Sequence, residues 1–116
     1  MHIIAALNPA QLMTLKLNKY LHIPILLAII ASMNSKQRKT LETIFAKPVN
    51  GNIEWARIES VLVAMGCRVI EGSGSSVTFE KNGVRAYFHR PHPQKEALRY
   101  RVEAAREFLE ELGVKP

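Results

Sequence analysis

Apolar residues recur at helical spacing between residues 35 and 48. Leu41, Ile44 and Phe45 fall on one side of a helix, and Ser35 has a side chain that can cap its first turn. Pro48 lacks the backbone N–H that a helix interior requires, so the helix is expected to end before it. The pattern therefore predicts a first amphipathic helix that begins near Ser35.

A second helical pattern precedes Gly66, which is expected to end the helix in a left-handed conformation. Asn52, in the turn Asn50-Gly51-Asn52, is a suitable N-cap. The apolar positions recur at i, i+3, i+4 and i+7, with one more a turn earlier: Trp55, Ile58, Val61, Leu62 and Met65. This spacing predicts a second helix that buries one face.

Three short strands are predicted next. The first is Cys67–Glu71, which is rich in β-forming residues and is followed by a Gly-Ser break at residues 72–75. The other two strands flank Asn82-Gly83, a strong hairpin signal because both turn residues accept positive φ. Along them apolar residues alternate with polar ones: Val77, Phe79, Val84, Ala86 and Phe88.

A last helix is expected from about Lys95 to Leu112, after Pro91 and Pro93 have ended strand pairing, with Gly113 as its cap. Its apolar side is formed by Val102, Ala105, Phe108, Leu109 and Leu112. From Asn52 the order is therefore α-β-β-β-α. We predict an α+β fold: a three-stranded antiparallel sheet with helices on one face, plus an extra N-terminal helix.

A two-residue turn at Asn82-Gly83 fixes the register of the hairpin. The predicted pairs are Ser76 with His89, Val77 with Phe88, Thr78 with Tyr87, Phe79 with Ala86, Glu80 with Arg85, and Lys81 with Val84. One face is apolar and is expected to be buried under the helices. The polar face is expected to be open to solvent or to a ligand, and it carries Ser76, Thr78, Glu80, Arg85, Tyr87 and His89.

Residues 1–33 form an apolar extension, distinct from a domain over residues 34–116. Residues 1–32 contain Lys16 and Lys19 but no carboxylate, and the apolar run 23–31 is shorter than the roughly 20 residues that cross a bilayer as a helix. We favour an upstream start, with Met33 as the first residue of the protein, because a charged, capped helix follows it. A signal or anchor segment and a packing extension are the alternatives. A chain that begins at Met33 is expected to fold.

The charge balance favours a polyanionic partner. The 116 residues include 16 Lys and Arg and 10 acidic residues, all of them Glu, which gives a formal net charge of +6. The single cysteine, Cys67, excludes an intrachain disulfide and a Cys-rich zinc site. We expect no metal, no cofactor and no membrane association, and a cytoplasmic location.

The segment His89-Arg90-Pro91-His92-Pro93 carries the densest chemistry. RNA cleavage without a metal needs a base for the 2′-hydroxyl, a cation for the phosphorane and an acid for the leaving oxygen. Two imidazoles and a guanidinium supply these groups. As metal ligands the histidines lack partners, since the chain has no Asp and Cys67 lies on another strand.

The order of elements from Trp55, with the Pro91-His92-Pro93-Gln94-Lys95 stretch and a terminal helix ending in Leu112-Gly113, resembles the HicA family over about residues 36–116. HicA proteins are small RNA-cleaving toxins of bacterial toxin–antitoxin pairs, with a fold similar to double-stranded-RNA-binding domains. The resemblance implies an endoribonuclease that acts on messenger RNA and is neutralised by a HicB-type antitoxin.

One position departs from the family pattern. The family has its catalytic histidine at the start of the second strand, where this chain has Ser76, or Gly74 in the other register. Two interpretations follow: a toxin with a relocated histidine, or a relative without activity that binds RNA or the antitoxin. A structural domain whose basic excess has no function is a third.

The hairpin register suggests where a relocated histidine stands. His89 lies opposite Ser76 on the same face and is the expected base, with His92 as the expected acid. Tyr87 is expected to stack on a base, and Arg90 to hold the scissile phosphate. Arg85, Lys95 and Arg99 are expected to bind the RNA backbone, with Lys95 and Arg99 one turn apart at the start of the last helix.

Overall fold

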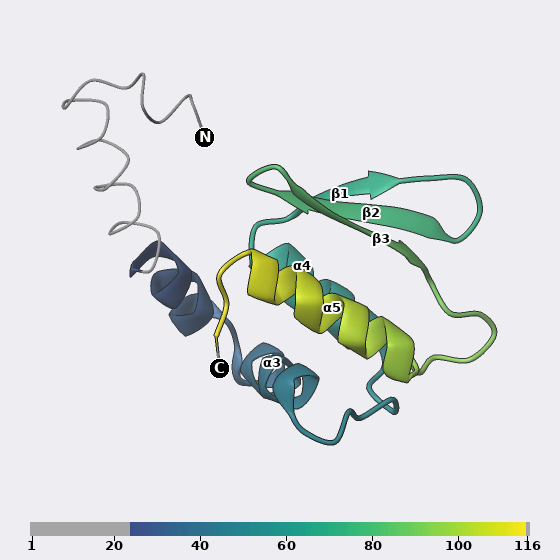
Figure 1. The fold of residues 1–116 in the computed structure, drawn as a ribbon, viewed down its shortest axis with the longest axis horizontal. Helices are drawn as coiled ribbons and strands as arrows, with labels where there is room; N and C mark the ends of the chain where they lie inside the picture. The colour runs from purple at the N-terminus through teal and green to yellow at the C-terminus, as the bar shows by residue number, and fades with distance from the viewer. Residues whose placement is uncertain (1–23, 116) are drawn as a thin grey trace, which may run out of the picture.

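The predicted order of elements is confirmed in the computed structural model of the chain, which describes residues 24–115. Three helices and three strands follow one another after a helical stretch at residues 24–32 (Figure 1). The elements are α3 (Ser35–Phe45), α4 (Trp55–Ala64), β1 (Arg68–Glu71), β2 (Ser76–Lys81), β3 (Val84–His89) and α5 (Arg99–Glu111). The fold is therefore α+β, with the α-β-β-β-α order and the extra N-terminal helix that the pattern predicts.

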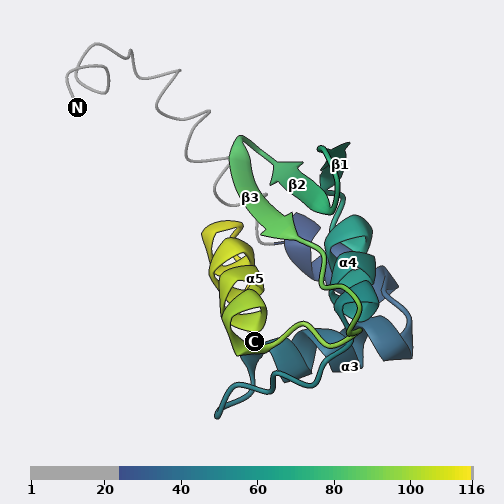
Figure 2. The same ribbon diagram turned by 90° about the vertical axis from the view of Figure 1, so that its right-hand side faces the viewer.

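The molecule is built in layers. The antiparallel sheet has the order β1-β2-β3, and α4 and α5 cover one of its faces (Figure 1). Helix α3 packs against α4 and α5 on the side away from the sheet, as the second view shows (Figure 2). The other face of the sheet is not covered by these helices.

The hairpin register is confirmed at every predicted pair, from Ser76↔His89 to Lys81↔Val84. Asn82 and Gly83 have φ values of 53° and 79°, as a two-residue turn of this hand requires. Because the register is fixed, Val77, Phe79 and Phe88 all point into the helical layer, where they are buried.

Aromatic rings join α4 to the sheet. Trp55 packs against Phe88 with the ring centroids 4.9 Å apart and against Phe79 at 6.4 Å, and the two Phe rings are 6.0 Å apart. Tilted and edge-on aromatic pairs contribute about 0.5–1.5 kcal/mol each beyond the area that they bury. The predicted apolar sides of α4 and α5 complete this core, since all ten of their positions are buried: Trp55, Ile58, Val61, Leu62, Met65, Val102, Ala105, Phe108, Leu109 and Leu112.

The predicted N-caps were wrong at both early helices. Asn34, not Ser35, caps α3: its side chain accepts from the backbone N–H of Gln37, whose own side chain accepts from the N–H of Asn34. Glu54, not Asn52, precedes α4, and its side chain makes no capping hydrogen bond.

The last helix begins at Arg99, four residues later than predicted. The backbone before it pairs with the chain ahead of α4 instead of coiling: Trp55 N–H donates to the Lys95 carbonyl at 2.8 Å, and Ala97 N–H donates to the Ile53 carbonyl at 2.7 Å. Ala97 is fully buried by this pairing. Lys95 and Arg99 are therefore not one turn apart on a helix, because Lys95 lies in an extended segment.

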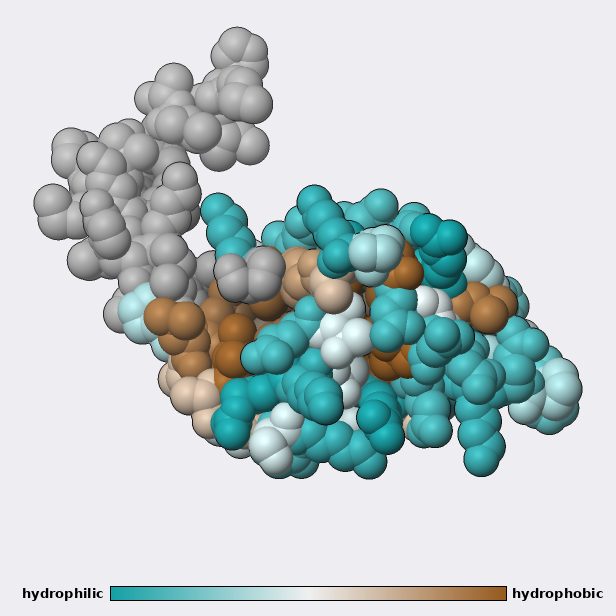
Figure 3. Space-filling model, turned by 90° about the horizontal axis from the view of Figure 1, so that it is seen from below, coloured by the Kyte–Doolittle hydropathy of each residue, from teal (hydrophilic) through white to brown (hydrophobic). Residues whose placement is uncertain are grey.

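Part of the N-terminal extension packs on the domain. Leu26 is 4% exposed and Met33 3%, and both belong to the hydrophobic core, while Ile25 and Leu27 are more than half exposed. Hydrophobic side chains accordingly gather at the end of the molecule where residues 24–32 lie (Figure 3). No helix within residues 24–115 has the length and apolar character needed to cross a membrane. Residues 1–23 of the predicted extension lie outside the described residues.

Removal of residues 1–32 should weaken the domain without unfolding it. Among residues 24–32, Leu26 is the buried core residue that is lost, together with the partly buried Ile29 and Ile30, and truncating a buried Leu typically costs about 2–5 kcal/mol. We expect a chain beginning at Met33 to keep its circular dichroism spectrum but to unfold at lower urea concentration. Leu26→Ala in the full chain should reproduce most of the loss, and Leu27→Ala should change stability by less than about 0.5 kcal/mol.

Either of two outcomes would contradict this account of the extension. An unfolded short chain would make residues 1–32 necessary for the core to form. A short chain as stable as the full one would mean that Leu26 contributes nothing.

Candidate nucleic-acid interface

Three chain segments meet at one end of the sheet. In an antiparallel sheet of order β1-β2-β3, the last residues of β1 and β3 lie at the same end as the first residue of β2. Glu71, Ser76 and His89 are these residues, and the turn of residues 72–75 closes this end. The candidate chemistry of the chain is concentrated here.

His89 is exposed and lies between two hydroxyl groups. Its Nδ1 is 3.3 Å from Ser75 Oγ, and its Nε2 is 3.2 Å from the hydroxyl of Tyr87. The rings of Tyr87 and His89 meet edge to face, with centroids 5.2 Å apart. A hydroxyl both donates and accepts, so the two contacts suit either neutral tautomer and the imidazolium. The two hydroxyl groups therefore orient the ring from both of its nitrogens.

Ser76 does not lie on an open surface, in contrast to the prediction. It is 5% exposed, and its Oγ donates to the Ser73 carbonyl at 2.7 Å inside the turn. The turn closes over it: a Cβ atom on Gly72 would lie 2.1 Å from Ser76 Oγ, so a larger residue there would displace the Ser76 hydroxyl. Ser76, the first residue of β2, therefore stabilises the turn.

Arg90, next to His89, is held by two carboxylates. Its Nε donates to Glu59 on α4, and its two terminal nitrogens donate to the two oxygens of Glu71 at 2.7 and 2.9 Å. Trp55 Nε1 donates to the same Glu59 oxygen. The backbone N–H of Arg90 donates to the Ser75 carbonyl at 2.9 Å. This arrangement, the Arg90 network, binds α4, the end of β1 and the turn to the residue that follows His89.

The Arg90 network also shifts the pKa values of its charged members. Hydrogen bonds from Arg90 lower the pKa of Glu71 below its usual 4.5, and the same bonds raise the pKa of Arg90. Both groups therefore stay charged at neutral pH.

The remaining predicted residues do not all lie at this end, since Arg85 is next to the hairpin turn of residues 82–83 at the opposite end of the sheet. Tyr87 is 62% exposed, and Arg85 lies 3.5 Å from Glu80, which also pairs with Arg68. His92 is exposed in the segment between β3 and α5, and no hydrogen bond within residues 24–115 joins it to His89.

Lys95 lines a hollow with Arg90, Pro91 and Pro93, and Arg99 is the first residue of α5. The structure thus brings Tyr87 and His89 into contact and leaves the other predicted side chains separate.

Sequence reasoning missed two residues that hold His89 in place. Ser75 contacts its ring, and Arg101 Nε donates to its backbone carbonyl at 2.7 Å. Arg101 is twelve residues away, and no local pattern indicates a contact over that separation. Ser75 could have been found from the register, since it precedes the partner of His89.

Cys67 does not contribute reactive chemistry. It is buried, and burial raises the pKa of its thiol to about 11, an effect that nearby Lys81 only partly opposes. The thiol is therefore protonated at neutral pH, and a thiolate nucleophile is excluded at this position.

Comparison with known families gives one match. A family model described as the HicA toxin of bacterial toxin–antitoxin matches residues 55–114, from the start of α4 to the residues after α5. Searches of curated proteins and of solved structures found no match. The matched segment contains the sheet, His89 and the Arg90 network, while α3 lies before it.

The ion pair of Glu71 should make stability depend on pH in the acid range. The folded-state pKa of Glu71 is lowered, so its contribution is complete above about pH 4.5 and is lost as pH falls through the lowered value. We expect Glu71→Gln to be less stable than the parent at pH 7 and nearly equal to it once Glu71 is protonated. Urea unfolding at a series of pH values measures the difference.

Glu42→Gln serves as the matched control, because Glu42 is exposed and has no ion pair within the described residues. A stability difference for Glu71→Gln that stays constant down to the acid limit would contradict the pairing with Arg90.

Proposed function

The chain belongs to the HicA family of toxins from bacterial toxin–antitoxin systems, and from this we propose that it is an RNA-cleaving toxin with His89 as its catalytic base. The observation that supports the proposal is the position of His89: exposed, at the end of β3, and paired across the ladder with the residue where the family has its histidine. Paired residues project from the same face about 4.5–5.5 Å apart. An imidazole on position 89 reaches much of the space that one on position 76 would reach.

The proposed reaction needs no metal. Neutral His89 accepts the proton of an RNA 2′-hydroxyl, and that oxygen attacks the adjacent phosphorus. The bond from phosphorus to the 5′ oxygen breaks, leaving a 2′,3′-cyclic phosphate on one product and a 5′-hydroxyl on the other. We propose His92 as the acid that gives the leaving oxygen its proton.

The proposal also assigns roles in RNA binding to the other predicted residues. Tyr87, exposed beside His89, stacks on a base, and Arg85, Lys95 and Arg99 bind phosphates. The contacts of Arg90 support a positioning role in place of direct phosphate binding, because all three of its guanidinium nitrogens donate to Glu59 or Glu71. Messenger RNA is the proposed substrate in the cytoplasm, and a HicB-type protein the proposed antitoxin.

A second candidate function rests on Ser76. The position of the family's histidine holds a buried hydroxyl that donates to the Ser73 carbonyl and cannot act as a base. The alternative is therefore a relative that binds RNA or the antitoxin without cleaving.

Cleavage of RNA by the purified chain distinguishes these functions. We expect His89→Ala to lower the cleavage rate about 10²- to 10⁴-fold, the usual contribution of a general base, with its melting temperature nearly unchanged. His92→Ala tests the acid in the same assay. Tyr87→Phe keeps the ring and removes only the hydroxyl beside His89, so it should cleave far faster than His89→Ala.

Two results would reject the proposed role of His89. A parent chain that binds RNA but does not cleave it would support the non-catalytic alternative. A folded His89→Ala chain with full activity would place the base elsewhere.

RNA binding through Lys95 and Arg99 should be visible in its salt dependence. Each lost phosphate contact lowers the slope of log affinity against log salt by about 0.7 for a single strand. We expect Lys95→Gln with Arg99→Gln to lower the slope by about 1.4, equally for different sequences. Lys47→Gln with Lys115→Gln removes the same charge from two other exposed positions and should not change the slope. Equal slopes in the two double variants would remove Lys95 and Arg99 from the interface.

A further inference from the structure

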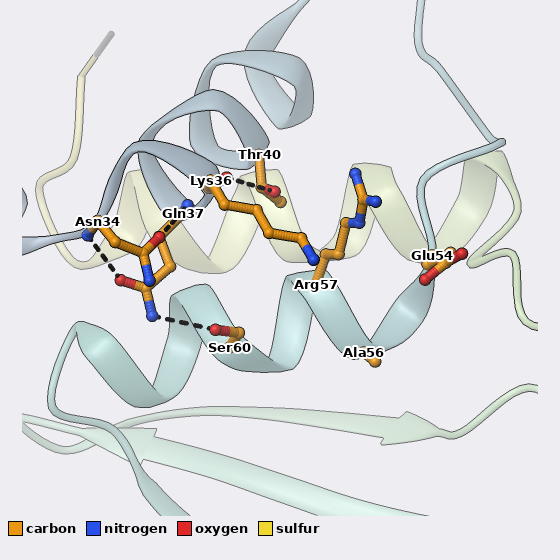
Figure 4. Close-up of a pocket in the computed structure, with 8 residues that line it drawn as sticks. All are labelled: Asn34, Lys36, Gln37, Thr40, Glu54, Ala56, Arg57 and Ser60. Atoms are coloured by element: carbon orange, nitrogen blue, oxygen red, sulfur yellow. Dashed lines mark hydrogen bonds between the residues drawn. The ribbon is translucent and has the colours of Figure 1, made fainter.

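A polar groove with three cationic side chains lies between α3 and α4. Lys36 and Lys39 come from α3 and Arg57 from α4, and the groove they line has a volume of about 290 Å³. Figure 4 shows Lys36 and Arg57 reaching into the same space from the two helices, with Glu54 apart from them at the start of α4. Amide and hydroxyl side chains form most of the remaining wall: Asn50, Asn52, Thr40 and Thr43.

These three cations have no partner in the part of the chain that the structure describes. Within residues 24–115, the side chains of Lys36, Lys39 and Arg57 make no ion pair and no hydrogen bond. Other cations of the domain are engaged: for example, Arg38 donates to the Met33 carbonyl, Lys81 to the Met65 carbonyl, and Arg106 to the Ile44 and Ala46 carbonyls at the end of α3. The groove thus concentrates positive charge that the fold itself does not use.

The charge in the groove is not balanced. Glu54 is the single carboxylate among its lining residues, against three cations. Like charges this close repel one another, and a bound anion removes that repulsion. The chemistry of the lining therefore fits an anion with several oxygens, which ammonium, guanidinium and amide donors all recognise.

The groove leads to the cations of the proposed RNA site. Asn50 and Asn52 line both this groove and a hollow on the other side of the turn, where Arg99 lies. The stem of Arg99 packs over Gly51, since a Cβ there would be 2.9 Å from Arg99 Cγ. Glu54 also lines both this groove and the hollow of Lys95. This end of the molecule, where the segments before α4 and α5 run side by side, faces the viewer in Figure 2.

We infer that the groove between α3 and α4 binds backbone phosphates of the RNA at a second site beyond the one at His89. The inference rests on the proposed function. The bound RNA then runs from Lys95 and Arg99, around the turn of residues 50–52, to Lys36, Lys39 and Arg57. A chain of phosphates carries one negative charge at each nucleotide, which suits cations spaced along a continuous surface. Lys36 and Lys39 lie outside the segment matched by the family, so α3 adds this site to the domain.

The test compares the double variant Lys36→Gln with Arg57→Gln against Lys47→Gln with Lys115→Gln. Both variants remove two charges at exposed positions. Binding is measured over a salt series with RNAs of about 4 and about 16 nucleotides, the limits of typical single-strand site sizes. For the long RNA we expect the groove variant to lower the salt slope by about 1.4, and the control variant to leave it unchanged. For the short RNA neither variant should differ from the parent.

Each of three other results would overturn the inference. If the parent cleaves RNA and the groove variant keeps the parent's slope on the long RNA, the groove is not an RNA site and the proposed function stands. If the parent binds neither RNA, the proposed function and this inference both fail. Poly-glutamate of the same charge is the competing ligand: if the groove variant weakens its binding as much as that of RNA, the site is a general polyanion site and the assignment to RNA is overturned.

Discussion

The guanidinium of Arg90 is the contact on which the geometry of the sheet end depends. One side chain donates to Glu59 on α4 and to both oxygens of Glu71 at the end of β1, while its backbone N–H donates to the turn before β2. Removal of Arg90 would take away the ion-pair partner of both carboxylates and leave Glu59, which is only 23% exposed, with the Trp55 indole as its hydrogen-bond donor. Breaking a partly buried pair costs more than an exposed pair contributes, so the network restricts substitution at this position.

The Arg90 network also restrains the position of His89. Its backbone is restrained by the ladder to Ser76, by Arg90 on the following residue, and by Arg101, which donates to its carbonyl. Its ring is oriented by Ser75 and Tyr87. A side chain whose backbone and ring are both restrained loses little further entropy when a ligand binds. At this end of the sheet, β3 and the Arg90 network therefore form the rigid part, and the imidazole of His89 is the exposed part.

Local physics accounts for what the sequence predicts correctly. The hairpin register follows from Asn82-Gly83 because two residues with positive φ allow one pairing only, and the helical faces follow from apolar spacing. The errors arise where distant segments compete with local preference. Lys95, Glu96 and Ala97 are good helix formers, yet they pair with the backbone of residues 53–55. Ser76 alternates like an exposed residue, yet the turn of residues 72–75 folds over it.

The proposed transfer of the catalytic imidazole from β2 to β3 also changes which cations follow it along the chain. Position 76 opens β2 and is enclosed by a turn without any Lys or Arg, residues 72–75. Position 89 ends β3 and leads into the segment that carries Lys95 and then Arg99. An imidazole on position 89 lies one strand away from one on position 76, about 4.7–4.9 Å, on the strand that leads into this segment. Because the stretch with Lys95 is part of the resemblance to the family, the proposed assignment moves the base to the strand next to a cationic segment that the family pattern already includes.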